Sequence, residues 1–518
     1  MFIKILLLVV FFAVMIGVGL YCRKHATDVN GFVLGGRSVG PWLTAFAYGT
    51  SYFSAVIFVG YAGQFGWKFG VASTWIGIGN AFLGSLLAWV ILGRRTRLMT
   101  QHLGSATMPE FFGKRFKSTP LKIGAAIIVF VFLIPYTASL YNGLSRLFSM
   151  AFPGVSYELC VIIMAVLTGI YVIVGGYMAT AVNDFIQGII MLIGIVAVIA
   201  AVLSQHGGFT SSLVELAKVE NEKMPGAFAS FFGPDALGLG FVILLTSLGT
   251  WGLPQMVQKF YAIKSEKDIS KGTIISTLFA VVVAGGCYFL GGFGRISGVA
   301  TTAAGTPEGG FDAVIPTMIN GLGSDILIAL VIVLVLSASM STLSSLVLTS
   351  SSTITLDLIK DNLVKKMSEK KQLLVLRLFI VVFIVISALI AVVQYNSNIT
   401  FIAQLMGVSW GALAGSFLAP FLFGLYWKKT TKASVWVSFI FGSGFMTFNL
   451  INTLCGLNLF PKLLESPVNC GVVTMLAGLI IVPVVSLFTK KLGKNDVDGM
   501  FDCYEKEVSV SAKESLGD

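Results

Sequence analysis

The chain has 518 residues, of which 56% are apolar and 11% are charged, and its mean hydropathy is +0.89. Soluble domains usually carry about a quarter charged residues and seldom exceed about 250–300 residues around one core. Long apolar runs recur from end to end, so the composition excludes a soluble protein and predicts an all-α membrane protein. The net charge of +11 reflects loop topology and anionic lipid rather than nucleic acid.

Thirteen apolar runs are predicted to cross the membrane as helices. A crossing needs about 20 residues for a hydrocarbon core ~30 Å thick. The first run, residues 2–21, has this length and lacks a cleavage site before Cys22, so we expect a retained helix rather than a signal peptide. The other twelve runs are residues 41–66, 73–93, 123–151, 158–175, 185–203, 238–257, 272–295, 324–355, 374–396, 400–426, 433–453 and 469–489.

Basic residues fall unevenly between the two sets of connecting segments. One set holds 28 of the 35 Lys and Arg residues, and basic residues accumulate in cytoplasmic loops. This set comprises residues 22–40, 94–122, 258–271, 357–377, 427–432 and 490–518. The pattern predicts a multi-pass protein of the cell membrane with its N-terminus outside and its C-terminus cytoplasmic.

Motifs for catalysis and for ATP hydrolysis are missing from the sequence. The six cysteines form no C-x-x-C pair, and no G-x-x-x-x-G-K-[ST] loop is present. We therefore expect neither an enzyme nor an ATP-driven pump. Cys455 and Cys470 flank one loop, and either a disulfide or two free thiols is compatible with that placement.

Two predicted spans are interrupted near their middles. Small and hydroxyl residues interrupt the second span at residues 49–51, and glycine and proline interrupt the seventh at residues 249–254. Small residues also serve helix packing, which is the alternative interpretation of each interruption alone. Interruptions at matching places in two five-helix units are typical of inverted-repeat transporters. We therefore expect one repeat in residues 41–203 and an inverted one in residues 238–426.

The ninth span is the richest in hydroxyl groups. Twelve of the nineteen residues from Ser337 to Thr355 carry one. Ala338, Ser341, Thr342 and Ser345 share one helix face, and Ser344 adjoins it. Such hydroxyls can simply bond to carbonyls of their own helix. Facing a broken helix, however, they would supply the oxygen ligands that a hard cation such as sodium prefers.

Asp184 is an acidic residue near the predicted start of the sixth span. A carboxylate there can stabilise a helix N-terminus. Carboxylates at membrane depth are more often functional, as ion ligands or gating charges. Both interpretations are open for Asp184.

Three segments in order resemble motifs of the sodium:solute symporter family, over nearly the whole chain. They are Gly35–Pro41, Gly175–Gly188 and Ser339–Ser344. The resemblance implies a LeuT-like core of five plus five helices with one leading and two trailing helices. The corresponding division is a leading helix and linker at 1–40, repeats at 41–203 and 238–426, an extracellular loop at 204–237, trailing helices at 427–489 and a cytoplasmic tail at 490–518.

The resemblance also implies ligands for sodium as the coupling ion. The first site would use carbonyls of Thr50, Phe53 and Ala338 and the hydroxyls of Ser341 and Thr342. Some members have a second sodium site, and the matching residues here are Asp184, Ser341, Ser344 and Ser345. One or two sodium ions per cycle are both open.

The solute is less well defined than the ion. Proline transporters of the family place an aspartate where this chain has Tyr52, which weakens an assignment to proline. Sialic acid members place an arginine in the region that matches residues 132–136, which has none here, so sialic acid is disfavoured. Short strings at 252–255 and 314–317 resemble the pantothenate branch, and Gln64, Asn80, Asn142 and Gln404 could serve a sugar. The partner is therefore a small organic solute: pantothenate, an amino acid, a monocarboxylate or a sugar. Expected solute contacts are Tyr48, Tyr52, Ser54, Gln64, Thr250, Trp251 and Gln255.

These features predict a sodium-coupled symporter that imports its solute by alternating access. A sodium-independent carrier or a channel is the alternative. A channel needs a continuous pore, and paired broken helices fit that requirement less well.

Overall fold

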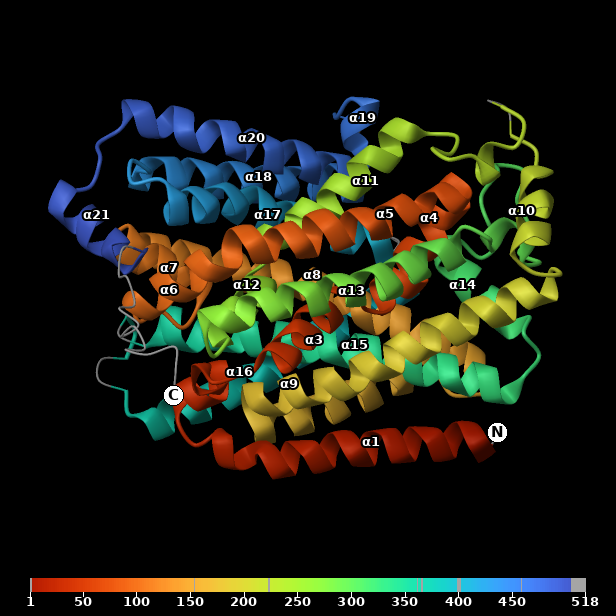
Figure 1. Cartoon of the computed structure of the whole chain (residues 1–518), viewed down its shortest axis with the longest axis horizontal. Coiled ribbons are helices and arrows are strands. Elements are labelled where there is room, and N and C mark those ends of the chain that lie inside the picture. The colour runs from red at the N-terminus through yellow and green to blue at the C-terminus, as the bar shows by residue number, and fades with distance from the viewer. Residues whose placement is uncertain are drawn as a thin grey trace, which may run out of the picture.

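The computed structural model describes residues 2–504 except 153, 222–223, 361, 365–366, 398–401 and 458. The described chain is a bundle of helices that run along its long axis (Figure 1). Ten helical stretches are long and apolar enough to cross a membrane, or eleven when the bent pair Ala236–Gly252 and Pro254–Ala262 is one span. The fold is thus that of a multi-pass membrane protein.

The longer helices are α1 (Phe2–Cys22), α3 (Pro41–Tyr52), α8 (Thr119–Ala151), α9 (Tyr157–Gln205), α11 (Ala236–Leu248), α13 (Glu266–Gly291), α15 (Asp325–Thr353), α16 (Glu369–Ser397), α17 (Ile402–Tyr426), α18 (Lys432–Cys455) and α20 (Pro467–Phe488). The shorter ones are α2 (Val29–Leu34), α4 (Ala62–Phe69), α5 (Thr74–Gly79), α6 (Arg94–His102), α7 (Met108–Arg115), α10 (Phe209–Ala217), α12 (Pro254–Ala262), α14 (Val314–Asn320), α19 (Lys462–Glu465) and α21 (Lys494–Phe501).

Hydroxyl side chains fix where several long helices begin. Ser118, Ser156 and Ser324 precede α8, α9 and α15, and each accepts a hydrogen bond from a backbone N–H of the first turn. Such caps satisfy donors that the helix itself leaves unpaired. The loop boundaries are therefore encoded locally, independently of the apolar runs that follow.

Two helical stretches are longer than the spans predicted from them. Val56–His102 has 47 residues and Tyr157–Gln205 has 49, which at 1.5 Å per residue is roughly 70 Å each. The predicted spans 158–175 and 185–203 thus join within α9. The backbone of α9 leaves helical geometry at Gly176, with φ 57° and ψ −153°. A Cβ at Gly176 would lie 2.9 Å from the Phe32 carbonyl oxygen, so α2 packs directly against this kink.

Helix α3 lies in the interior of the bundle. It packs against α9, α13 and α15, and α12 contacts both α3 and α15. Helices α17, α18 and α20 form a group along one edge, whereas α1 lies along the opposite edge beside α9 (Figure 1). The start of α1 and the short helix α21 lie at opposite ends of the bundle (Figure 1).

Helices α4 and α13 approach each other as closely as their backbones allow. A Cβ added to Gly66 would lie 2.1 Å from the Gly291 carbonyl oxygen, and one added to Gly291 would lie 2.1 Å from the Ala62 carbonyl oxygen. Between helices in lipid there is no hydrophobic driving force, so association depends on close packing. Small residues at the contact permit that packing.

We therefore expect Gly291→Ala to destabilise the protein, because backbone atoms cannot yield as a side chain can. Overpacking of this kind costs ~1–3 kcal/mol or more. Thermal unfolding of the purified protein in detergent should show a melting temperature lower by several degrees. Gly285→Ala on the same helix is the matched control, since a Cβ there meets nothing within 4 Å. Equal melting temperatures for the two variants would contradict the close approach.

Candidate functional site

The first broken helix is interrupted at Phe53. Helix α3 ends at Tyr52, Phe53 is extended with φ −99° and ψ 114°, and helical structure resumes at Ala55. Two N–H groups released by the break are bonded to hydroxyls: Ala55 N–H donates to Ser339 Oγ (3.2 Å) and Val56 N–H donates to Ser54 Oγ (3.3 Å). The small residues 49–51, which predicted the break, form the last turn of α3 before it.

Hydroxyl groups of α15 bind the last turn of α3. Thr342 Oγ1 lies 3.2 Å from the Thr50 carbonyl oxygen, 3.3 Å from that of Ser51 and 3.1 Å from that of Ala338. Ser341 Oγ donates to Thr50 Oγ1 at 2.7 Å. The structure therefore brings together Thr50, Ala338, Ser341 and Thr342.

These residues form a dry and neutral cluster of oxygens. Thr50, Ser341 and Thr342 are fully buried, and Phe53, at the break itself, is 1% exposed. Hydroxyl and carbonyl oxygens in this arrangement fit the ligand preference of a hard monovalent cation. Four of the five residues predicted for the first sodium site thus lie together, and the fifth, Phe53, is the extended residue that follows α3.

The residues predicted for a second ion are Asp184 of α9 and three hydroxyl residues of α15, of which Ser341 also belongs to the first set. Asp184 is fully buried in α9, in the part of this helix that follows the non-helical Gly176. Its oxygens accept no well-formed hydrogen bond, although the Ser341 hydroxyl lies beside them. Ser344 Oγ donates to the Ser341 carbonyl at 2.8 Å, and Ser345 Oγ lies 2.8 Å from Ser51 Oγ.

Lys259 reaches this second group of oxygens. Its ammonium donates to Ser345 Oγ at 2.9 Å and lies 3.9 Å from Asp184 Oδ2. The sequence predicted Lys259 to lie in the cytoplasmic loop 258–271, but α12 continues to Ala262 and Lys259 is 2% exposed. The sequence did contain a signal for this longer helix. Proline is favoured at the first position of a helix, so Pro254 indicates that a new helix begins there and continues past residue 257.

Most of the predicted solute contacts are bonded to nearby backbone. Tyr48 and Thr250 both donate to the Gly84 carbonyl, at 2.7 and 3.2 Å, and Trp251 donates to Leu83 at 3.0 Å. Tyr52 donates to the Thr246 carbonyl. These side chains link the two broken helices to residues 83–84 and to each other.

Two glutamines keep polar atoms without partners. Gln255 is 1% exposed and neither atom of its amide has a hydrogen-bond partner; the same holds for Gln64 Oε1. Gln64 lies apart from the breaks and lines a cavity of about 360 Å³ together with Gln404. A buried amide without a hydrogen-bond partner is costly, and a bound solute would supply one. Gln255 is therefore the leading candidate among the predicted solute contacts.

Two aromatic rings lie beside Tyr52 at the first break, and neither of them was predicted from the sequence. Trp410 of α17 stacks on Tyr52 with ring centroids 5.6 Å apart and an interplanar angle of 19°. Tyr136 of α8 meets the same Trp410 edge-on at 5.9 Å. Only the tertiary fold brings residues so distant in the chain together.

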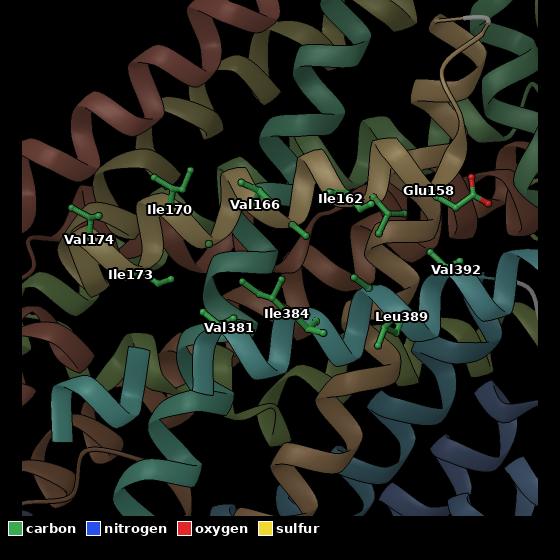
Figure 2. Close-up of a pocket in the computed structure, with 15 residues that line it drawn as sticks. Glu158, Ile162, Val166, Ile170, Ile173, Val174, Val381, Ile384, Leu389 and Val392 are labelled. Atoms are coloured by element: carbon green, nitrogen blue, oxygen red, sulfur yellow. The ribbon is translucent and has the colours of Figure 1, made fainter. Parts of the chain in front are cut away.

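Two further features lie away from the site. A groove of about 750 Å³ between α9 and α16 is lined by aliphatic side chains with Glu158 at one end, and it contains none of the predicted site residues (Figure 2). Its sides belong to membrane-crossing helices, so hydrocarbon chains suit it. Cys455 and Cys470 are both free thiols, which resolves the question of their pairing.

Residues 32–442 match the sodium:solute symporter family. The chain belongs to this family. It is 29% identical over 497 residues to the osmoregulated proline transporter OpuE of Bacillus subtilis, covering 94% of both chains. It is 32% identical over 441 residues to a sodium/proline symporter of Staphylococcus aureus, covering 83% of this chain and 82% of that one.

The fold of the symporter is also found in solved structures. The outward-open, substrate-bound Na+-coupled sialic acid symporter superposes with a TM-score of 0.71 over 95% of this chain and 99% of that one, at 16% identity. This likeness confirms an all-helical, LeuT-like fold, while the count of thirteen helices and the repeat layout stay predictions. Membership of the family confirms sodium-coupled solute symport, with sodium as the coupling ion, and places the chain among transporters.

Thr342→Ala should weaken sodium binding, because it removes a proposed ligand hydroxyl that lies beside two carbonyls of α3 and one of α15. We expect the sodium concentration for half-maximal solute uptake to rise at least tenfold, or ~1.4 kcal/mol. Thr342→Ser retains the oxygen and should stay within a few-fold of wild type. Ser352→Ala is the control, since Ser352 bonds only within its own helix, to Thr349 at 3.0 Å. An unchanged sodium dependence in Thr342→Ala would contradict this assignment.

Proposed function

We propose that the symporter imports a compact amino acid, with proline as the first compound to test, together with sodium bound between α3 and α15. The contact of Thr342 with the broken end of α3 is the observation that carries the proposal. The ligands would be the carbonyls of Thr50, Phe53 and Ala338 and the hydroxyls of Ser341 and Thr342.

Amino acid import is supported by the relatives and by the chemistry at the breaks. Both relatives described above bear names that refer to proline. The solute contacts predicted at the breaks are neutral, and Gln255 offers a buried donor and acceptor for a carboxylate or an amino group. Tyr52 stacks on Trp410, which gives a compact apolar ring an aromatic wall. These features suit a small zwitterion better than a bulky acid.

Coupling follows from where the ion would bind. Sodium bound between α3 and α15 would hold the broken helix in one position, and the aromatic residues beside that break would contact the solute. Ion and solute would then stabilise the same state, and each would raise the affinity for the other. Inward movement of one positive charge adds ~2.3 kcal/mol per 100 mV of membrane potential.

We also propose thirteen membrane crossings in two inverted repeats, 41–203 and 238–426, with the N-terminus outside. The two stretches of 47 and 49 residues are each long enough to cross twice, and the bent pair crosses once. Two crossings for each of these long stretches, one for the bent pair and one for each of the other eight stretches give thirteen. The basic segments then share one side, the cytoplasmic one.

Uptake by proteoliposomes is the test of function. Labelled proline should accumulate only with an inward sodium gradient, and an inside-negative potential should increase the rate. Unlabelled pantothenate, monocarboxylates, sugars and other amino acids should be compared as competitors. Flux indifferent to sodium, or too fast for a carrier cycle, would contradict symport.

Gln255→Ala should raise the KM for the solute severalfold and leave equilibrium sodium binding unchanged. Gln205→Ala serves as control, because this amide is exposed and donates to Gly321 at 3.0 Å. If labelled proline does not accumulate, the other solutes should be tested in labelled form, and the one that accumulates should show the same response to Gln255→Ala.

The proposed orientation predicts that Cys455 reacts from outside the cell. Cys455 ends α18 and is exposed, whereas the other five cysteines are buried. A membrane-impermeant maleimide should therefore label the protein in intact cells, and Cys455→Ser should abolish the labelling. Labelling that requires permeabilised cells would reverse the orientation.

A further inference from the structure

A buried ammonium group occupies the position expected for a second cation. Lys259 Nζ donates to Ser345 Oγ at 2.9 Å and lies 3.9 Å from Asp184 Oδ2. Lys259 and Asp184 are 2% and 0% exposed as side chains. The Tyr177 ring lies 5.2 Å from the same ammonium, which adds a cation–π contact. A carboxylate, a hydroxyl and an aromatic face thus surround one fixed positive charge.

The oxygens around Lys259 are those that a second sodium ion would need. Asp184 is the carboxylate of the predicted second set, and Ser345 is one of its hydroxyls. The same Ser345 is 2.8 Å from Ser51 of α3, so little of its bonding capacity remains. A sodium ion at these oxygens would also be close to a like charge in a medium that screens poorly.

We propose that Lys259 permanently takes the place of the second sodium ion, so that this symporter moves one sodium ion per solute. This inference rests on the proposed function for the first sodium site and adds the stoichiometry of coupling. The ammonium neutralises Asp184, which would otherwise be a buried and uncompensated charge.

Lys259 also joins the two broken helices. It belongs to α12, the second half of the bent pair, and through Ser345 it connects to Ser51 in the last turn of α3. An ion at this position would have to bind and leave in each cycle, whereas a side chain moves with its helix. The same contacts can therefore be made and broken without transport of a second charge.

Equilibrium binding of ²²Na⁺ to the purified protein tests the proposal directly. Wild type should bind one ion per chain with a Hill slope of one. Lys259→Met removes the charge and retains much of the apolar side chain, and it should bind two ions per chain. Lys259→Arg retains the charge and should bind one. In the Lys259→Met background, Asp184→Asn should return the number to one.

Controls separate this inference from the proposed function. Lys264→Met removes an exposed lysine nearby and should leave the count at one. Wild type that binds two ions, or Lys259→Met that still binds one, would overturn the inference and leave the first site intact. Wild type that binds no sodium, with Thr342→Ala indistinguishable from it, would instead refute the proposed function. If Lys259→Met does not fold, the wild-type count and Lys259→Arg decide.

Discussion

The structure depends on how one break in a buried helix is satisfied. Backbone groups inside a membrane have no water to bond, so an interrupted helix is stable only where other groups replace the lost hydrogen bonds. Here α15 provides those groups: Ser339 accepts from Ala55 N–H, and Thr342 donates between carbonyls of α3 and its own helix. The hydroxyl-rich stretch of α15 therefore stabilises the break and would provide the proposed ion ligands at the same time.

The same cluster stabilises the break in α3 and would bind the ion. Ion binding would therefore be coupled to the geometry of α3. The Thr342 hydroxyl, which bonds the carbonyls of Thr50 and Ser51, can instead turn its oxygen toward an ion. The Thr50 and Ala338 carbonyls that it leaves would then be available as ligands as well. Sodium would replace one set of contacts by another of similar geometry, and the end of α3 need not be rebuilt at each cycle.

The sequence predicted the hydroxyl face of α15 correctly because helical period is a local property. The face that contains Ala338, Ser341, Thr342 and Ser345 follows from spacing alone, and the structure places these residues toward α3 and α12. The position of the break was less accessible. Small residues indicated 49–51, yet the extended residue is Phe53, because a helix can end after its weakest turn rather than within it.

Other errors came from ending a predicted helix at the residue where the sequence becomes polar. The run 238–257 stops where polar residues begin, so Lys259 was counted among cytoplasmic charges. Its burial depends on Asp184 and Ser345, which come from α9 and α15. Likewise the two predicted spans 158–175 and 185–203 lie within α9, separated by the non-helical Gly176. Only tertiary contacts decide whether a charge or a glycine pair ends a helix.

The two broken helices thus contribute groups of different charge to one region. The last turn of helix α3 places neutral oxygens beside α15, whereas α12 contributes the Lys259 ammonium, which is paired with Asp184 of α9. The protein itself is then electrically balanced at this depth before any ion enters. A single sodium ion at the neutral oxygens would be the only uncompensated charge there, so the membrane potential would act on the ion and not on the ligands that hold it. With a neutral solute, each transport cycle would carry one positive charge inward.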